Sequence, residues 1–385
     1  MTELRPNLTA PSMDPPEASL PLERVRQVLQ AGYTQPFLLV DSGIIREKYR
    51  RFVAAMPTVR VHYAVKANPH ADVVKVLADE GAAFEMASRA ELDLILSLGG
   101  RPDEVHYSNP IKPQSYIEHA ARNGVDWFAL DSVDELKKIH AIAPSANLYL
   151  RIDVPDFGSD WPLSGKFGAK ADEIEVILDA AATLQARLCG VTFHVGSQCR
   201  NVENWRGAIK TAHEVFGRMK AKGLQARLLN IGGGFPVKLT KPIPSIEAIG
   251  RTINAALAEL PGDIRIMAEP GRYLVSDAAC LVCQVIGKAT RDGKRWLYLD
   301  VGMFGGLFES TQGLEYELAT DRPGRLVPWH VAGPTCDSVD VLVHDQMLPE
   351  DLDIGDFVYV RNAGAYSTAY ASEFNGFPLP EVRVI

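Results

Sequence analysis

Between about residue 59 and residue 270, short apolar runs alternate with segments that carry apolar residues at helical spacing. Each run has the length of one buried strand, and several of the intervening segments close with glycine, as helices do. Eight such units over roughly 210 residues predict an α/β fold with a (β/α)8 TIM-like barrel, and make a doubly wound open sheet the weaker choice. The predicted strands are VRVHYAVK (59–66), AAFEMA (82–87), VHYSN (105–109), WFALD (127–131), NLYLRID (147–153), CGVTFHV (189–195), ARLLNI (226–231) and RIMAE (265–269).

The last hundred or so residues follow a different pattern, in which β-prone runs succeed one another through loops without helices between them. This predicts a C-terminal antiparallel β-sandwich or β-barrel domain. The run PFLLVDSG (36–43) precedes the barrel and is expected to add a strand to that domain. We therefore expect a disordered tail over 1–20, a strand and helix of the β domain over 21–43, the barrel over 44–271 and the β domain over 272–385.

Composition narrows the class of protein. The chain has 385 residues, 46% of them hydrophobic, and a net charge of −8 without a compensating basic run, which argues against binding nucleic acid. No apolar stretch is long enough to span a membrane, and the polar, proline-rich start does not read as a signal peptide. The five cysteines are few and scattered, which favours a reducing, cytoplasmic location.

Metal chemistry is not expected. Cys280 and Cys283 form a CxxC pair inside an apolar run, with no second pair and no nearby histidine, so strand packing is favoured over zinc or redox use. The nine histidines do not show metal-ligand spacing either.

Charged and polar residues close the predicted strands, where the active site of such a barrel gathers. Lys66 ends the run VHYAVK, and apolar surroundings disfavour its ammonium, so we expect a neutral, nucleophilic amine of the kind that forms Schiff bases. The alternative is a strand-end lysine that reaches out to water. The other residues at these ends are Glu85, Asn109, Asp131, Arg151, His194, the run Gly232, Gly233 and Gly234, and Glu269.

Two turns suggest a phosphate site. Three consecutive glycines let backbone amides approach a ligand closely, although a tight turn alone would also explain them. The sequence EPGRY (269–273) joins Glu269 to Arg272, and arginine suits phosphate. A lysine, a phosphate cradle, a carboxylate and an imidazole together suggest pyridoxal phosphate. Glu269 would keep its ring nitrogen protonated, which favours reactions with a carbanion at Cα, such as decarboxylation.

Six motifs stand in order between about residue 36 and residue 378, and together they resemble the ornithine/lysine/diaminopimelate decarboxylase family of pyridoxal-phosphate enzymes, which has an alanine-racemase-like barrel. The chain is most similar to the bacterial ornithine decarboxylases of that family. The motifs are HYAVKANP (62–69), TFHVGSQC (192–199), NIGGGFP (230–236), AEPGRYLV (268–275), GPTCDSVD (333–340) and GAYSTAYASEFNGF (364–377).

The resemblance implies a role for each matching residue. Lys66 would form the Schiff base, His194 would stack on the cofactor ring, and Glu269 would bond its nitrogen. Cys336 would return a proton to Cα after carbon dioxide leaves. In this family the active sites lie at the interface of a homodimer, so Cys336 and Asp337 would enter from the partner subunit. The remaining cofactor contacts implied are Glu85, Arg151, Ser197, Gly233, Gly234, Gly271, Arg272 and Tyr366, and the substrate contacts are Asp337, Glu309 and Phe374.

The chain departs from the family at two places. The second strand is followed by Glu85-Met86-Ala87-Ser88, where relatives often have another sequence, so the role of Glu85 is less directly implied. The stretch MFGGLFES (303–310) differs from the eukaryotic ornithine enzymes and looks like the bacterial branch. Glu309 is its candidate for holding the substrate amine, and a loop carboxylate facing water is the alternative.

The pair Cys336-Asp337 guides the choice of substrate, because ornithine and lysine enzymes carry Cys-Asp here whereas diaminopimelate enzymes usually carry Cys-Glu. An aspartate facing a distal ammonium forms a charge-assisted hydrogen bond. We expect the chain to decarboxylate L-ornithine to putrescine, with lysine to cadaverine as the second choice. Three alternatives stay open. The enzyme could decarboxylate diaminopimelate or a larger conjugated amino acid, it could be a racemase, or the chain could be a non-catalytic regulator of the polyamine pathway. Racemases usually follow the lysine with a Tyr-Gly-His-Gly run, which is missing here, and a regulator should have lost the lysine, the cysteine or the phosphate contacts.

Overall fold

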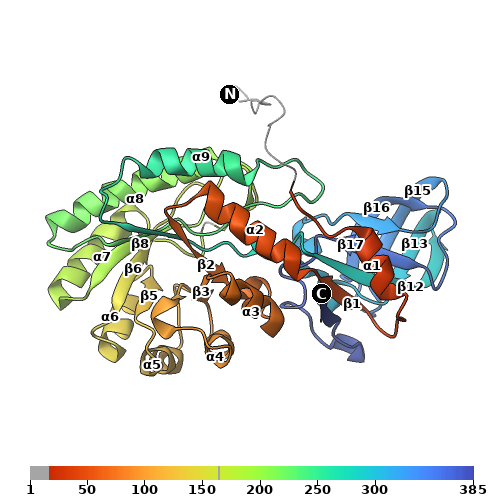
Figure 1. Cartoon of the computed structure of the whole chain (residues 1–385), viewed down its shortest axis with the longest axis horizontal. Helices are drawn as coiled ribbons and strands as arrows, with labels where there is room; N and C mark the ends of the chain where they lie inside the picture. Colours follow the sequence, from red (N-terminus) through yellow and green to blue (C-terminus); the bar gives the residue numbers. More distant parts are fainter. Residues whose placement is uncertain (1–16, 164) are drawn as a thin grey trace.

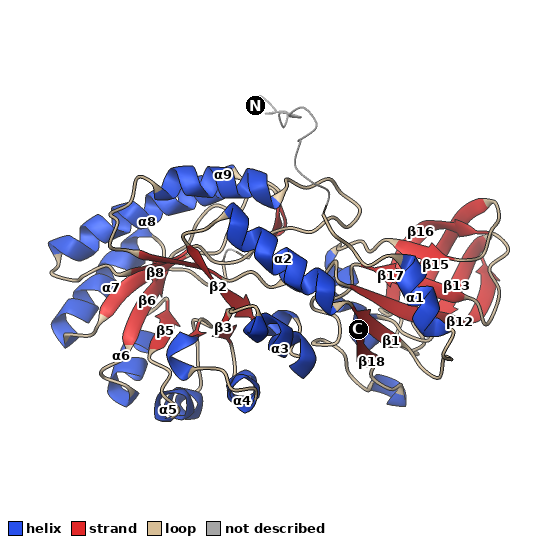
Figure 2. Cartoon of the chain, viewed as in Figure 1, coloured by secondary structure: helices blue, strands red, loops and turns tan. Residues whose placement is uncertain are grey.

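The computed structural model describes residues 17–163 and 165–385, so the predicted tail over 1–20 lies largely outside the described residues. One part of the chain forms a barrel surrounded by helices, and a second part forms a sheet beside it (Figure 1). The same division is visible when the chain is coloured by secondary structure (Figure 2). Among the described residues, no helix combines the length and the apolar character needed to cross a bilayer.

The barrel is closed and consists of eight parallel strands, which confirms the predicted fold class. In order around the barrel, the strands are β10 (Leu228–Asn230), β11 (Arg265–Ala268), β2 (Val59–Ala64), β3 (Ala83–Met86), β4 (Val105–Tyr107), β5 (Trp127–Leu130), β6 (Asn147–Arg151) and β8 (Leu188–Thr192). Each predicted run corresponds to one strand, which stops one to three residues before the run does. Most of the polar residues at the ends of the runs therefore lie on the following loops, whereas Glu85 and Arg151 lie within β3 and β6.

Several helices around the barrel carry recognisable start and stop signals. The side chains of Ser88, Ser132 and Ser245 cap three helix N-termini by accepting hydrogen bonds from backbone amides. Glycines with positive φ, such as Gly81 and Gly124, follow several C-termini. The helices are α2 (Ser42–Ala55), α3 (Ala71–Asp79), α4 (Arg89–Ser97), α5 (Gln114–Arg122), α6 (Val133–Ile142), α7 (Ala171–Leu184), α8 (Glu203–Ala221) and α9 (Ile246–Leu257).

The second domain is an eight-stranded sheet, with α1 (Leu22–Leu29) beside it (Figure 1). The expected strand from 36–43 is present as β1, which pairs antiparallel with β12, where Cys280 and Cys283 are buried. The sheet is mostly antiparallel, as predicted, with two parallel pairings, of β13 with β15 and of β1 with β18. Its strands are β1 (Phe37–Val40), β12 (Ala279–Arg291), β13 (Lys294–Leu299), β14 (Leu318–Thr320), β15 (Leu326–Ala332), β16 (Val341–Pro349), β17 (Phe357–Arg361) and β18 (Glu381–Val384).

The loop after β17 connects the second domain to the mouth of the barrel. The backbone N–H of Tyr366 donates to the carbonyl of Ala67 over 2.7 Å, and the side chain of Asn68 donates to the carbonyl of Gly364 over 2.9 Å. At the same mouth, β7 (Ser159–Trp161) pairs with β9 (Ser197–Cys199), and the short helix α10 (Arg272–Val275) follows the last barrel strand. These contacts place residues from both domains around one cavity.

Candidate active site

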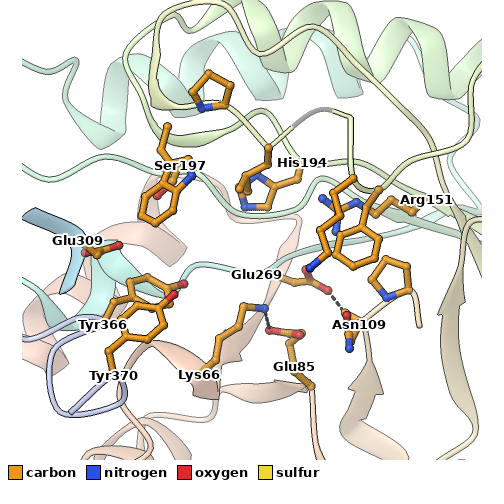
Figure 3. Close-up of a pocket in the computed structure, with 18 residues that line it drawn as sticks. Lys66, Glu85, Asn109, Arg151, His194, Ser197, Glu269, Glu309, Tyr366 and Tyr370 are labelled. Atoms are coloured by element: carbon orange, nitrogen blue, oxygen red, sulfur yellow. Dashed lines mark hydrogen bonds and ion pairs between the residues drawn. The ribbon is translucent and has the colours of Figure 1, made fainter. Parts of the chain in front are cut away.

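A cavity of about 490 Å³ lies at the carboxyl ends of the barrel strands, between the barrel mouth and the loop that follows β17. Parallel strands all end at the same rim, so residues far apart in the sequence converge there. Figure 3 shows several of the predicted residues around this space, among them Lys66, His194 and Glu269. The polar residues that line it include Lys66, Glu85, Asn109, Arg151, His194, Ser197, Glu269, Glu309, Tyr366 and Tyr370.

Lys66 lies in a single 3-10 turn (Val65–Ala67) directly after β2. Its Nζ is 2.6 Å from Oε2 of Glu85, which is buried on β3 (Figure 3). Burial favours the neutral amine, but Glu85, Tyr366 and Glu269 outweigh it and raise the pKa of Lys66 above its usual value. The expectation of a neutral amine is therefore wrong for this structure, because apolar sequence neighbours do not reveal the carboxylates that the fold brings close.

Glu269 follows β11 and is held from the barrel side. Its Oε1 accepts hydrogen bonds from the hydroxyl of Ser108 and, over 2.6 Å, from the side-chain amide of Asn230. Burial, and then the charge of Glu85, raise the pKa of Glu269, while Lys66 and the two hydrogen bonds act in the opposite direction. The group is thus a partly buried carboxylate whose charge depends on its donors.

His194 is a neutral imidazole in this site. Its Nδ1 accepts a hydrogen bond from the backbone N–H of Gly196 over 3.1 Å, which assigns the ring proton to Nε2. Burial, followed by the nearby charges of Arg151 and Lys66, lowers the pKa of His194 to about 3. A Cβ atom at Gly233 would lie 3.1 Å from Nε2, so the glycine lets the loop approach the ring.

A smaller cavity, of about 40 Å³, adjoins the first and has the character of an anion cradle. Arg272 is buried; its Nη2 pairs with Oε1 of Glu309 over 2.5 Å, while its Nε and Nη1 have no hydrogen-bond partner among the described residues. Buried guanidinium groups need acceptors, so these two N–H groups fit the oxygens of a phosphate. Among the cofactor contacts that the resemblance implies, six line this cavity: Ser197, Gly233, Gly234, Gly271, Arg272 and Tyr366.

Glu309 is almost fully buried, in a 3-10 turn (Phe308–Gln312). The alternative of a loop carboxylate facing water is therefore wrong. The sequence could not show this, because the burial depends on Arg272 from the other side of the site.

The residues predicted to contact the substrate from a partner subunit, with Phe374, do not line the cavity of their own chain. Cys336 and Asp337 are exposed on the loop between β15 and β16, and the thiol and backbone N–H of Cys336 donate to Oδ1 of Asn375. Phe374 is 40% exposed and packs on Phe304, with ring centroids 4.5 Å apart. These residues lie together on the second domain, at the surface of the chain.

Asp131 does not belong to the ring of residues around the cavity, contrary to expectation. Strand β5 ends at Leu130, and Asp131 already begins the turn into α6. Its carboxylate accepts a hydrogen bond from the backbone N–H of Gly168 over 3.0 Å and borders a separate hollow between α6 and α7.

The residues that hold Glu269 were not predicted from the sequence. Ser108 and Asn230 were not singled out, although Asn230 stands two residues before the glycine run and Ser108 lies near the end of a predicted strand. The same rule of polar residues at strand ends would have found both. It would not have found Trp161, Pro162 and Leu163, which form an apolar wall of the cavity from the end of β7 and the loop that follows it, a segment without periodicity.

A parallel barrel with a lysine, an imidazole, a carboxylate held by two donors and an anion cradle at its mouth defines a pyridoxal-phosphate-binding protein. Comparison with known families agrees: the pyridoxal-binding domain of the pyridoxal-dependent decarboxylases matches residues 42–276, and the C-terminal sheet domain of these enzymes matches residues 272–364. The chain belongs to this family of pyridoxal-dependent decarboxylases of basic amino acids, and its cofactor is pyridoxal phosphate.

Individual relatives cover nearly the whole chain. Ornithine decarboxylase of Schizosaccharomyces pombe is 36% identical over 374 residues, which are 92% of this chain and 84% of the relative. Antizyme inhibitor 2 of Xenopus laevis is also 36% identical, over 92% of this chain and 82% of its own length. The crystal structure of lysine/ornithine decarboxylase from Vibrio vulnificus with cadaverine superposes with a TM-score of 0.88 at 35% identity, covering 94% of this chain and 98% of that one.

Proposed function

We propose that the chain decarboxylates a basic L-amino acid, with L-ornithine as the preferred substrate and lysine as the second, to give putrescine or cadaverine. The observation that carries this proposal is a single cavity that holds Lys66 and Glu269 and continues into the cradle around Arg272. Relatives named ornithine decarboxylase and lysine/ornithine decarboxylase support the choice of substrate.

Different residues of the chain would bind different parts of pyridoxal phosphate. Ser197, Gly233, Gly234, Gly271, Arg272 and Tyr366 would hold the phosphate, and Lys66 would hold the aldehyde carbon covalently. When bound, the cofactor supplies a sink for the electron pair left at Cα when carbon dioxide departs. Glu269 would hold a proton on the ring nitrogen, while neutral His194 would cover the ring without adding positive charge. Glu85 and Arg151 would border the ring.

The proton for Cα and the contact to the far end of the substrate are proposed to come from a second copy of the chain. Cys336 and Asp337 are exposed and adjacent, and they do not line the cavity of their own chain, which supports a site shared between two subunits. The thiol of Cys336 would donate its proton to Cα. The carboxylate of Asp337 would accept charge-assisted hydrogen bonds from the distal ammonium of the substrate.

Glu309 contacts Arg272 within the chain, in addition to its proposed contact with the substrate amine. Its Oε1 is used by Arg272, whereas its Oε2 is buried without a hydrogen-bond partner among the described residues. This supports a role in holding the guanidinium, with Oε2 left for a substrate amine. The exposed position of Phe374 fits the same shared interface as Cys336.

Replacing Asp337 by alanine should raise the KM for ornithine by about 10- to 100-fold, the range of a hydrogen bond between charged groups, with a smaller effect on kcat. Carbon dioxide release from ornithine, lysine, arginine and diaminopimelate measures both the substrate preference and this effect. Asp263→Ala, on an exposed turn before β11, is the matched control and should leave KM unchanged. An unchanged KM in Asp337→Ala would remove the argument for a basic substrate.

The same panel separates the alternatives. Faster turnover of diaminopimelate than of ornithine would replace the proposed substrate, and turnover of none of the four would point to a larger conjugated amino acid or to a regulator. The similarity to the relative named antizyme inhibitor 2 is the reason to test for a regulator. A regulator without catalysis is favoured if the pure protein also fails to develop visible cofactor absorption with pyridoxal phosphate.

A further inference from the structure

A pair of hydroxyl groups lies inside the barrel beneath Glu269, and the proposed chemistry does not use it. The Oγ of Ser108 is 2.6 Å from the phenol oxygen of Tyr149, and the hydroxyl of Ser108 donates to Oε1 of Glu269. Both side chains are buried, and Tyr149 is fully buried on β6. The three groups form one chain from the barrel interior to the cavity.

The direction of the hydrogen bonds in this chain follows from counting protons. Ser108 has one hydroxyl proton, which it gives to the carboxylate of Glu269, so its oxygen must accept from Tyr149. Burial, and then the charge of Glu269, raise the pKa of Tyr149 well above its usual value, so its phenol keeps the proton that it donates. An ionised carboxylate is the group that this arrangement satisfies.

The barrel interior holds Tyr149 in place. Its ring packs against His106 and Trp127, with ring centroids 5.7 and 6.3 Å away, and these two rings stack on each other at 5.2 Å with only 3° between their planes. Burial lowers the pKa of His106 far below its usual value, so the imidazole is neutral and does not compete for Glu269. The phenol therefore reaches Ser108 from a rigid wall.

We propose that Ser108 and Tyr149 are positioning residues that, together with Asn230, saturate Oε1 of Glu269 and leave Oε2 as the anionic oxygen for the ring nitrogen of the cofactor. Asn230 donates to the same oxygen over 2.6 Å. Charge-assisted donors favour the ionised carboxylate over the neutral acid, and so oppose the effect of burial. The inference rests on the proposed role of Glu269.

The test compares two ligands that differ only at the ring nitrogen: pyridoxal phosphate and its 1-deaza analogue, which has carbon at that position. The full chain, freed of cofactor, is titrated with each, and the ratio of the two dissociation constants is the readout. Ser108→Ala should reduce the preference for pyridoxal phosphate about tenfold and Tyr149→Phe about threefold. Tyr107→Phe is the matched control, since its buried phenol lacks a hydrogen-bond partner among the described residues, and should leave the ratio unchanged.

A chain of donors also predicts non-additivity. The double variant Ser108→Ala/Tyr149→Phe should be no worse than Ser108→Ala alone, because Tyr149 acts through Ser108. If the single variants bind both ligands more weakly by the same factor, the hydroxyls only support packing and the inference is wrong. Glu269→Ala tests the underlying role separately. An unchanged ratio of dissociation constants in this variant would refute the proposed function of Glu269. If the ratio falls in Glu269→Ala but stays unchanged in the Ser108 and Tyr149 variants, only the inference is refuted.

Discussion

Replacing Lys66 by alanine is expected to abolish covalent attachment of pyridoxal phosphate and to lower the rate of decarboxylation at least about 1000-fold. The amine of Lys66 lies at the centre of the polar residues in the cavity, 2.6 Å from Glu85. Borohydride reduction of the loaded protein, followed by digestion and mass spectrometry, measures the attachment directly. The labelled peptide from the unchanged protein should contain Lys66.

Lys166 provides a demanding control for this experiment, because its side chain lines the same cavity. Its Nζ lies 5.0 Å from the ring centroid of Phe167, and it projects from the loop between β7 and α7. Lys166→Ala should still be labelled at Lys66. A label on Lys166 in the unchanged protein, or normal turnover in Lys66→Ala, would show that the site has been assigned to the wrong lysine.

The raised pKa of Lys66 affects how pyridoxal phosphate would attach to this side chain. An ammonium does not attack an aldehyde, so Lys66 must pass its proton to a neighbour first, and the adjacent carboxylate of Glu85 is within hydrogen-bond distance. The order of events could not be inferred from the sequence. Apolar neighbours along the chain suggested a neutral amine, whereas the charge of Lys66 is decided by groups on β3, directly after β11 and on the loop after β17.

The barrel was predictable because its signal is local and repeated. Nearly all residues of the barrel strands are buried, so each strand appears as a mainly apolar run, and the helices show a periodicity of their own. The strand ends were less accurate, because the turn after β2 also buries Val65 and Ala67 and so extends the apolar run past Ala64. The domain boundaries expected from the sequence stay a prediction.

The strands of the second domain were harder to find where their pattern is weak. β14 has only three residues, and β16 is an edge strand in which His344 and Asp345 are exposed, so neither shows a clear apolar run. The parallel pairing of β1 with β18 joins segments more than 300 residues apart. Such pairing depends on the assembled sheet and has no local signature.

Within the site, the useful rule was that functional residues of a barrel gather at the carboxyl ends of its strands. It located Lys66, His194 and Glu269, because each follows a buried strand. It could not predict partners that come from the side, such as Tyr149 beneath Glu269 or Arg272 against Glu309. Those contacts join residues of different strands and domains, and their energies depend on burial that only the fold creates.

Mixing two inactive variants is expected to restore activity if the sites are shared between subunits. Cys336→Ala alone should lower formation of the amine product about 100-fold, the contribution of a positioned proton donor, and Lys66→Ala should be inactive. Their heterodimer has one site with both residues intact and one with neither. Random exchange makes half of the dimers mixed, each with one good site of two, so the mixture should recover about a quarter of the unmutated activity.

The matched control mixes Lys66→Ala with Glu269→Ala. Both residues line the cavity of the same chain, so each chain of that heterodimer carries a damaged cavity and no site is complete. This second mixture should stay inactive under conditions in which native mass spectrometry shows equal subunit exchange. Recovery in neither mixture would mean that Cys336 does not act across the interface, and recovery in both would mean that the variants repair each other without sharing a site. Only recovery confined to the first mixture requires Cys336 of one subunit to act on the cavity that holds Lys66 of the other.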